Sequence, residues 1–243
     1  MISAIRKFIK KLVCSNVNKQ PLVIDKPESF EIKKVALCKE DINSKVVIFF
    51  EEQFSVEAKN KINNKKWILR YCIKKAWIDA TISERFKKDS LIIKNKENII
   101  CFLEEQLHNN HYNICRDFNY WHNSVCESTI YNMRYGVWQK LINMTFKYLY
   151  CVKTQFPEFS AIWHSCHCPI DTIIAKQIYN KLKDKNVNEC DLLISQKISK
   201  SDKNINWNNI TKQDYLKLQN QIKSLCIDMG VVPIEFDFLY WGK

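Results

Sequence analysis

Apolar residues recur along most of this chain at the three-to-four-residue spacing of amphipathic helices. On this spacing we expect helices over residues 48–62, 65–82, 97–115 and, most clearly, 134–152. Two short runs, 45–50 and 90–94, could be strands, although extensions of neighbouring helices explain them nearly as well. The pattern predicts a mainly α-helical, multi-helix globular fold, with one or two short strands in the N-terminal half.

The C-terminal half shows the same helical spacing with clearer boundaries. A helix is predicted over 171–182, and the polar stretch 183–206 is interpreted as an exposed connection. Thr211 is the type of residue that caps a helix N-terminus, and Gly230 the type that ends one. The aromatic segment 231–243 is expected to dock on the core.

Three regions follow from these boundaries. We expect a basic amphipathic N-terminal helix over 1–20, an N-terminal helical region over 21–125, and a helical region over 126–243 that carries the candidate site, with the regions packed as one two-lobed unit. The first helix is too charged to span a membrane. It could lie on a membrane surface, but packing against the protein is favoured. No transmembrane segment or signal peptide is expected.

Composition narrows the class of partner. The chain has 243 residues and a formal net charge of +12, with a pI near 9.1. Such a balance favours a polyanion, either nucleic acid or an anionic membrane surface. The richness in Lys, Asn and Ile also fits A/T-rich coding DNA, which would raise the basic count without any partner.

Cysteine and glycine usage exclude some classes. Eleven scattered cysteines, an odd number, indicate reduced thiols in an intracellular protein. We therefore expect a cytoplasmic protein, associated with the nucleoid if its partner is DNA. The chain contains only three glycines and lacks the glycine-rich motifs that hold phosphates in Rossmann and P-loop proteins, so those enzymes are unlikely matches.

The candidate chemistry centres on one lysine and one aspartate. Lys140, Asn143 and Lys147 form a polar stripe on the helix predicted over 134–152. Asp171 begins the next helix, where it can accept backbone N–H bonds. If the two helices bring Lys140 and Asp171 together, the pair can perform amine-based covalent chemistry. The alternatives are a solvated helix face and a capping residue.

Two further regions are candidates for the same cleft. The run His164-Ser165-Cys166-His167-Cys168 has the ligand types of a zinc site, but no second half-site exists elsewhere in the chain, so no metal is expected. His167 could instead contact a phosphate or substrate. The aromatic and polar texture from 207–210 to Tyr215 and Gln219 could line the cleft as well.

Two short motifs carry a resemblance to a known superfamily. Gly136-Val137-Trp138-Gln139-Lys140 resembles the G-V-G-x-K hairpin of helix-hairpin-helix DNA glycosylases of the 8-oxoguanine type, and Cys168-Pro169-Ile170-Asp171-Thr172 resembles their P-[VI]-D-[TV] segment. The resemblance covers about residues 130–180 and is closest to the archaeal type. Trp138 replaces the second glycine of the hairpin, and the cysteine quartet of the iron–sulfur branch is missing.

The resemblance implies a base-excision glycosylase with AP lyase activity. Lys140 would attack C1′ of a flipped-out nucleotide bearing a damaged, 8-oxoguanine-like base, and Asp171 would accept its proton. The remaining implied contacts divide by role. Substrate contacts would come from Trp138, Gln139, Asn143, Trp163 and His167, and contacts to the nucleic-acid backbone from Gly136, Lys147 and Lys153.

Other function classes stay open. A non-catalytic, basic helical protein that binds nucleic acid, in a mobile element or a defence system, fits the same charge. A helical interaction protein whose charge reflects codon usage fits as well. We expect a monomer that binds DNA, with RNA as the other possible partner, and no cofactor.

Overall fold

The computed structural model describes residues 28–81, 91–128, 130–183, 189–200 and 206–241, and within these ranges the side chains from residue 39 onward except those of 189–193. Its contacts divide the chain into Met1–Lys34 and Val35–Lys243, and the description below concerns the second unit. The basic helix expected over 1–20 lies outside the described residues.

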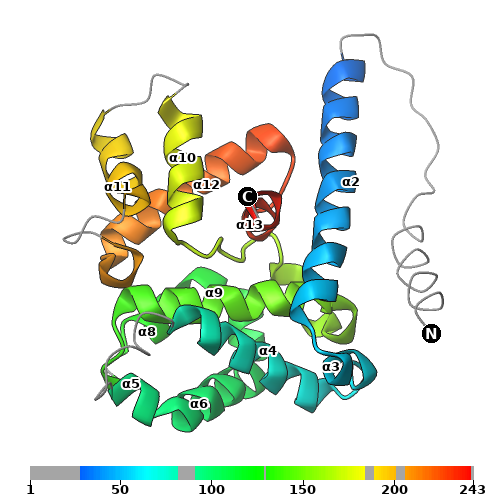
Figure 1. The fold of residues 1–243 in the computed structure, drawn as a ribbon, viewed down its shortest axis with the longest axis vertical. Coiled ribbons are helices and arrows are strands. Elements are labelled where there is room, and N and C mark those ends of the chain that lie inside the picture. Colours follow the sequence, from blue (N-terminus) through cyan, green and yellow to red (C-terminus); the bar gives the residue numbers. More distant parts are fainter. Residues whose placement is uncertain (1–27, 82–90, 129, 184–188, 201–205, 242–243) are drawn as a thin grey trace. The chain divides into compact units, whose positions relative to one another are not determined.

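Every regular element in the described ranges is helical, so the mainly α-helical prediction is confirmed (Figure 1). The helices up to α9 are α2 (Glu28–Gln53), α3 (Val56–Asn60), α4 (Lys65–Ala80), α5 (Leu91–Lys94), α6 (Lys96–Asn109), α7 (His111–Arg116), α8 (Phe118–Cys126), η1 (Ile130–Asn132) and α9 (Tyr135–Cys151). They are followed by η2 (Lys153–Gln155), η3 (Pro157–Ile162), α10 (Thr172–Lys183), α11 (Glu189–Ser199), η4 (Trp207–Asn209), α12 (Lys212–Met229) and α13 (Pro233–Tyr240).

The prediction of short strands in the N-terminal half is wrong for the described residues. Residues 45–50 continue α2, and 91–94 form α5. Both runs are too short for periodicity to separate a strand from a buried piece of helix. The exposed connection expected over 183–206 is also wrong in part, because α11 lies within it.

Local chemistry explains where several helices begin and end. The side chain of Asn64 caps α4 by accepting the N–H of Trp67, and that of Thr211 caps α12 by accepting the N–H of Asp214. Gly230 ends α12 in the left-handed conformation, with φ of 65°. The caps predicted at Thr211 and Gly230 are therefore confirmed.

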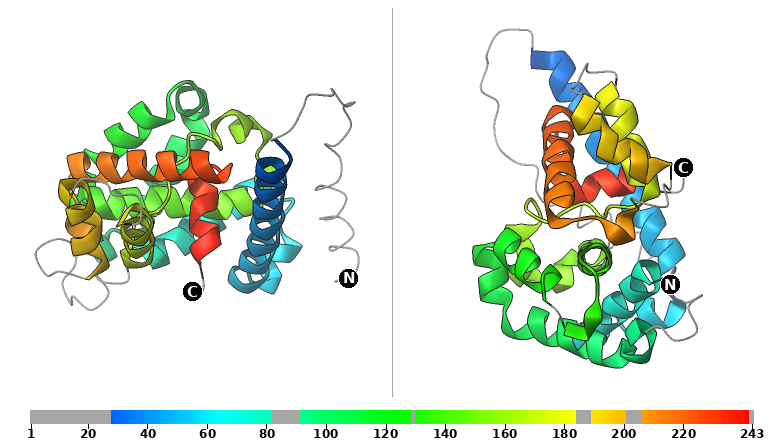
Figure 2. Two further views of the ribbon diagram at one scale, coloured as in Figure 1. Left: turned by 90° about the horizontal axis from the view of Figure 1, so that it is seen from above. Right: turned by 90° about the vertical axis from the view of Figure 1, so that its left-hand side faces the viewer.

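Helix α9 lies between two groups of helices, as Figures 1 and 2 show, with α4, α6 and α8 on one side and α10, α12 and α13 on the other. All of its residues from Gly136 to Tyr150 are buried. Its predicted stripe of Lys140, Asn143 and Lys147 is therefore not a solvated face. A polar side chain on this helix must find its partner inside the protein.

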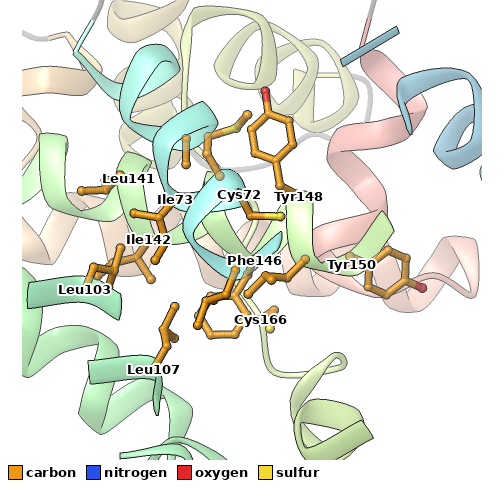
Figure 3. Packing of buried hydrophobic residues seen from close by; sticks show 14 of the residues in the cluster. Cys72, Ile73, Leu103, Leu107, Leu141, Ile142, Phe146, Tyr148, Tyr150 and Cys166 are labelled. Atoms are coloured by element: carbon orange, nitrogen blue, oxygen red, sulfur yellow. The ribbon is translucent and has the colours of Figure 1, made fainter. Parts of the chain in front are cut away.

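Two apolar clusters meet at this helix. The first packs α4 and α6 with α9, and Ile73, Leu103 and Phe146 are among its members (Figure 3). The second is formed mainly by α10, α12 and α13, and includes Ile170 just before α10. None of the described helices has both the length and the apolar character needed to cross a bilayer.

Candidate functional site

Lys140 and Asp171 lie in direct contact. The Lys140 ammonium on α9 donates to Asp171 Oδ2 across 2.7 Å, and the two side chains are 7% and 28% exposed. Asp171 Oδ1 accepts the N–H of Ile174 at 2.9 Å, so the same carboxylate also caps α10. The structure thus brings together two residues that are 31 positions apart in the sequence, and it gives Asp171 its predicted capping role as well.

Electrostatics holds this pair in its charged form. Burial alone would lower the pKa of Lys140, but the carboxylates of Asp171, Asp237 and Asp79 together outweigh it, and the pKa lies above its ordinary value. Burial alone would raise the pKa of Asp171, but Lys140 and the Ile174 N–H outweigh it and lower the pKa. The resting pair is therefore an ammonium and a carboxylate.

Trp207 flanks the pair because one glycine allows its close approach. The ring of Trp207 lies 5.9 Å from the Lys140 ammonium, at the edge of the cation–π range. One turn before Lys140, a Cβ on Gly136 would lie 2.2 Å from the carbonyl oxygen of Trp207. Gly136 is thus a helical residue pressed against η4. It does not form an open turn, and its placement is at odds with the expected phosphate contact.

Lys147 is enclosed. Its ammonium lies 2.5 Å from Asp237 Oδ2, and the two side chains are 1% and 8% exposed. The rings of Phe49, Phe238 and Trp241 surround it at 4.3, 4.9 and 5.9 Å. No phosphate can reach this lysine without a rearrangement of the core, so its expected role in backbone binding conflicts with its position.

Asn143 joins a buried hydrogen-bond network. Its Nδ2 donates to Gln139 Oε1 at 3.1 Å and to the Tyr215 hydroxyl at 2.8 Å, and its Oδ1 lies 3.1 Å from His122 Nε2. His167 Nδ1 lies 2.7 Å from the same hydroxyl. Gln139, Asn143 and His167, all expected to touch substrate, are therefore engaged with the protein itself.

Both histidines of this network are uncharged. Burial lowers the pKa of His122 to about 3, and burial together with His122 and Lys223 lowers that of His167 well below its ordinary value. A neutral His167 can donate from Nε2 to Asn119 Oδ1 at 2.7 Å and accept the Tyr215 proton at Nδ1. The Tyr215 hydroxyl, both ring nitrogens of His167 and Asn119 Oδ1 then form one continuous chain of hydrogen bonds.

The remaining residues predicted to contact the substrate or the nucleic-acid backbone, Trp138, Trp163 and Lys153, are not hydrogen-bonded to this network in the structure. Trp138 is fully buried, with its ring 5.7 Å from that of Phe102. Trp163 is half-buried and packs against other rings, and Lys153 is exposed and lies over the Tyr150 ring at 4.0 Å. Of these three residues, Lys153 is the one that a phosphate could reach. The aromatic ring next to the Lys140 ammonium belongs to Trp207 and not to Trp138, which was expected to stack on the substrate.

The network residues that the sequence interpretation missed are His122 and Asn119. Tyr215 and Gln219 were expected near the cleft, and both are buried in this network. A usable signal exists for Gln219, since it sits between the apolar residues Leu218 and Ile222 on the inward face of α12. An amide at such a position needs internal hydrogen-bond partners.

A hollow lies away from the Lys140–Asp171 pair. It has a volume of about 1170 Å³ between α4, α6 and η3. Its polar rim carries Arg70, which is paired with Glu97 and Glu104, and Lys65, which is paired with Glu158. These charges are already neutralised, so the rim has no strong preference for an anion.

Metal binding finds no support among the described residues, where no three His, Cys, Asp or Glu side chains are placed to hold an ion. His167 and Cys168 both face the interior, and His167 is bonded to Tyr215 and Asn119. Comparison of the chain with family models, with curated proteins and with solved structures finds no match.

Proposed function

We propose that this protein is a DNA base-excision glycosylase with AP lyase activity, in which Lys140 is the nucleophile and Asp171 its proton acceptor. The observation that carries the proposal is the 2.7 Å contact between the Lys140 ammonium and Asp171 Oδ2. A nucleophilic amine needs an adjacent base within hydrogen-bond reach, and this pair meets that requirement.

Charge and exposure add to the proposal. The net charge of +12 favours a polyanionic substrate such as DNA. Asp171 is the more exposed member of the pair, so a flipped-out nucleotide would approach from its side. Trp207, beside the Lys140 ammonium, offers a ring face for a base.

The proposed steps begin with proton transfer from the Lys140 ammonium to Asp171. The freed lone pair forms a bond to C1′ while the base leaves with the electrons of the glycosidic bond and takes up the proton that Asp171 received. The ring then opens at C1′ as O4′ accepts the nitrogen proton, which leaves an imine. The Asp171 carboxylate then takes the C2′ proton, and the 3′ phosphate leaves with the electrons of its C3′–O bond.

Because the resting pKa of Lys140 lies above its ordinary value, the first transfer is uphill. The proposal therefore requires that the substrate weaken the ion pair before attack. A closed, partly apolar complex would do so, since excluding water and separating the partners both lower the pKa of the amine.

Borohydride trapping tests the proposal. The protein is incubated with duplexes carrying 8-oxoguanine, uracil or an abasic site, and borohydride reduces any imine to a stable amine. We expect a covalent adduct that is absent in Lys140→Gln and retained in Lys176→Gln, which removes the same charge from the exposed face of α10. Adduct formation by Lys140→Gln at the wild-type level would overturn the assignment.

A second candidate is a non-catalytic nucleic-acid-binding protein. The observation that favours it is the dual role of Asp171, which caps α10 and pairs with a protonated Lys140 as a structural link would. This candidate predicts no adduct on any lesion, and DNA or RNA binding in a gel-shift assay that Lys140→Gln leaves unchanged.

A further inference from the structure

Two glutamines hold the segment that leads into Asp171. Gln219 on α12 donates to the carbonyl oxygen of Cys168 at 2.6 Å and accepts its N–H at 3.2 Å. Gln139 on α9 donates to the carbonyl oxygen of Ile170 at 3.4 Å and accepts its N–H at 3.5 Å. Each amide thus pairs with both backbone polar groups of one residue, as neighbouring strands do in a hydrogen-bonded pair.

The residue between these two contacts is Pro169, which has no N–H to satisfy. The non-helical segment Cys168–Ile170 consequently has its available backbone donors anchored from two different helices. Asp171 follows directly, so the position of its carboxylate depends on where α9 and α12 hold this backbone.

Asn143 fixes the orientation of one glutamine. Its Nδ2 donates to Gln139 Oε1 at 3.1 Å and points toward the carbonyl oxygen of Cys168 at 3.4 Å. Tyr215 and His122 hold Asn143 in turn. With Oε1 of Gln139 engaged as an acceptor, its Nε2 must face Ile170, and the amide cannot flip without losing these bonds.

Burial makes this arrangement stiff. Gln139, Asn143 and Gln219 are each at most 1% exposed, so water cannot replace a broken bond. A buried donor or acceptor that loses its partner carries the full cost of desolvation. Such a network specifies one geometry, which is what a catalytic pair needs.

We infer that Gln139 and Gln219 are positioning residues that place the Asp171 carboxylate against Lys140 by fixing the backbone of Cys168–Ile170. The inference about geometry stands on the contacts alone, and its consequence for catalysis rests on the proposed function. Gln139 precedes Lys140 on the same helix, so it couples the two halves of the pair most directly.

Titration of the Asp171 carboxyl by carbon NMR, in protein without DNA, tests the geometry. The signal is assigned with Asp171→Asn. We expect Gln139→Met and Gln219→Met to raise the pKa of Asp171 toward its ordinary value, because a displaced carboxylate gains less from the Lys140 ammonium. Gln219→Asn, which keeps the amide but retracts it by one methylene, provides a milder variant if a methionine variant does not fold.

Thr145→Val is the matched control. Thr145 is buried on α9 and donates to the carbonyl oxygen of Leu141, away from the 168–170 segment. It should lower stability without moving the pKa of Asp171. A pKa of Asp171 that stays at the wild-type value in the folded glutamine variants would overturn the inference.

Borohydride trapping of the same variants measures the effect on catalysis. A misplaced carboxylate should slow adduct formation by about tenfold to a hundredfold, with DNA affinity unchanged. If the wild type forms no adduct while the glutamine variants still raise the pKa of Asp171, the proposed function fails and the positioning role holds. If trapping occurs but the glutamine variants trap as fast as the wild type, the positioning role fails.

Discussion

Helix α9 supplies the lysines of two lysine–aspartate pairs, and these lysines lie about two helical turns apart. The two pairs differ in their surroundings. Lys140 and Asp171 meet at 2.7 Å with the carboxylate 28% exposed, beside a single indole ring. Lys147 and Asp237 meet at 2.5 Å with the carboxylate 8% exposed, among three aromatic rings. Both pairs consist of an ammonium and a carboxylate, but the carboxylate of the first pair is more exposed to solvent than that of the second.

This difference separates a structural pair from a candidate reactive one. A fully enclosed ion pair is hard to break and admits no substrate, so Lys147 and Asp237 serve to hold α13 against α9. A pair that reaches the surface can exchange partners with an incoming ligand. Among the predicted sites, exposure therefore separates a pair that a ligand could reach from one that it could not, although the residue types are the same.

The largest expected effect comes from breaking the enclosed pair. Asp237→Ala should leave the Lys147 ammonium buried without a counter-charge and lower the free energy of unfolding by about 3–5 kcal/mol. Asp171→Ala should cost less, about 1–2 kcal/mol for the lost cap, because the pair is 28% exposed on the Asp171 side and water can take the place of the carboxylate. Urea unfolding of the two variants measures the difference, and equal losses would contradict the contrast between the pairs.

The next prediction concerns Gly136 and Trp207, which lie beside the Lys140–Asp171 pair. Gly136→Ala would place a Cβ against the backbone of η4, and we expect it to lower the free energy of unfolding by about 3 kcal/mol, the upper end for overpacking. The displaced Trp207 should also leave Lys140 more exposed. Denaturant unfolding and indole fluorescence measure the two effects.

A matched substitution checks the cause of this loss. Trp207→Leu removes the ring but keeps the backbone contact with Gly136, so it should expose Lys140 at a smaller cost in stability. If Gly136→Ala unfolds at the same urea concentration as the wild type, η4 is free to move and does not define the site.

The third expected effect is measured per pH unit and concerns the neutral network that lies between the two charged pairs. His122 and His167 are neutral when folded but take up protons when unfolded, so their contribution is complete above pH 6.5 and declines as the pH falls toward their depressed folded pKa values. Each should reduce stability by about 1.4 kcal/mol per pH unit in this range.

Unfolding midpoints at pH 7 and pH 5 measure this slope. His167→Gln should flatten it by about half, because one of the two histidines no longer titrates. His108→Gln provides the control, since His108 is exposed at the end of α6. A slope in His167→Gln as steep as in the wild type would show that other groups cause the loss.

The spacing of apolar residues was sufficient to predict a helix where that helix is long and either buried on one side or buried all round. The predicted helices 65–82 and 134–152 correspond to α4 and α9 within two residues at each end. It was insufficient for α11, where a short apolar run lies in a polar context and packing against α10 and α12 supports the helix.

The same limit applies to the candidate site. The sequence singled out Lys140 and Asp171 as residues that two successive helices could bring together, and the structure places them in contact. The resemblance also implied that Lys147 and Gly136 contact the nucleic-acid backbone, because neither a short motif nor a polar stripe reveals what covers the helix. Here α13 covers Lys147 and η4 covers Gly136.

The sequence by itself determined the helical class, the caps at Thr211, Asp171 and Gly230, and the basic charge, because these follow from spacing and from local hydrogen bonding. Only the tertiary structure decided which of the two buried lysines on α9 pairs with a partly exposed carboxylate, and that two distant glutamines hold the segment before Asp171. Burial and long-range hydrogen bonds depend on which helices pack together, and no local pattern in the chain specifies that packing.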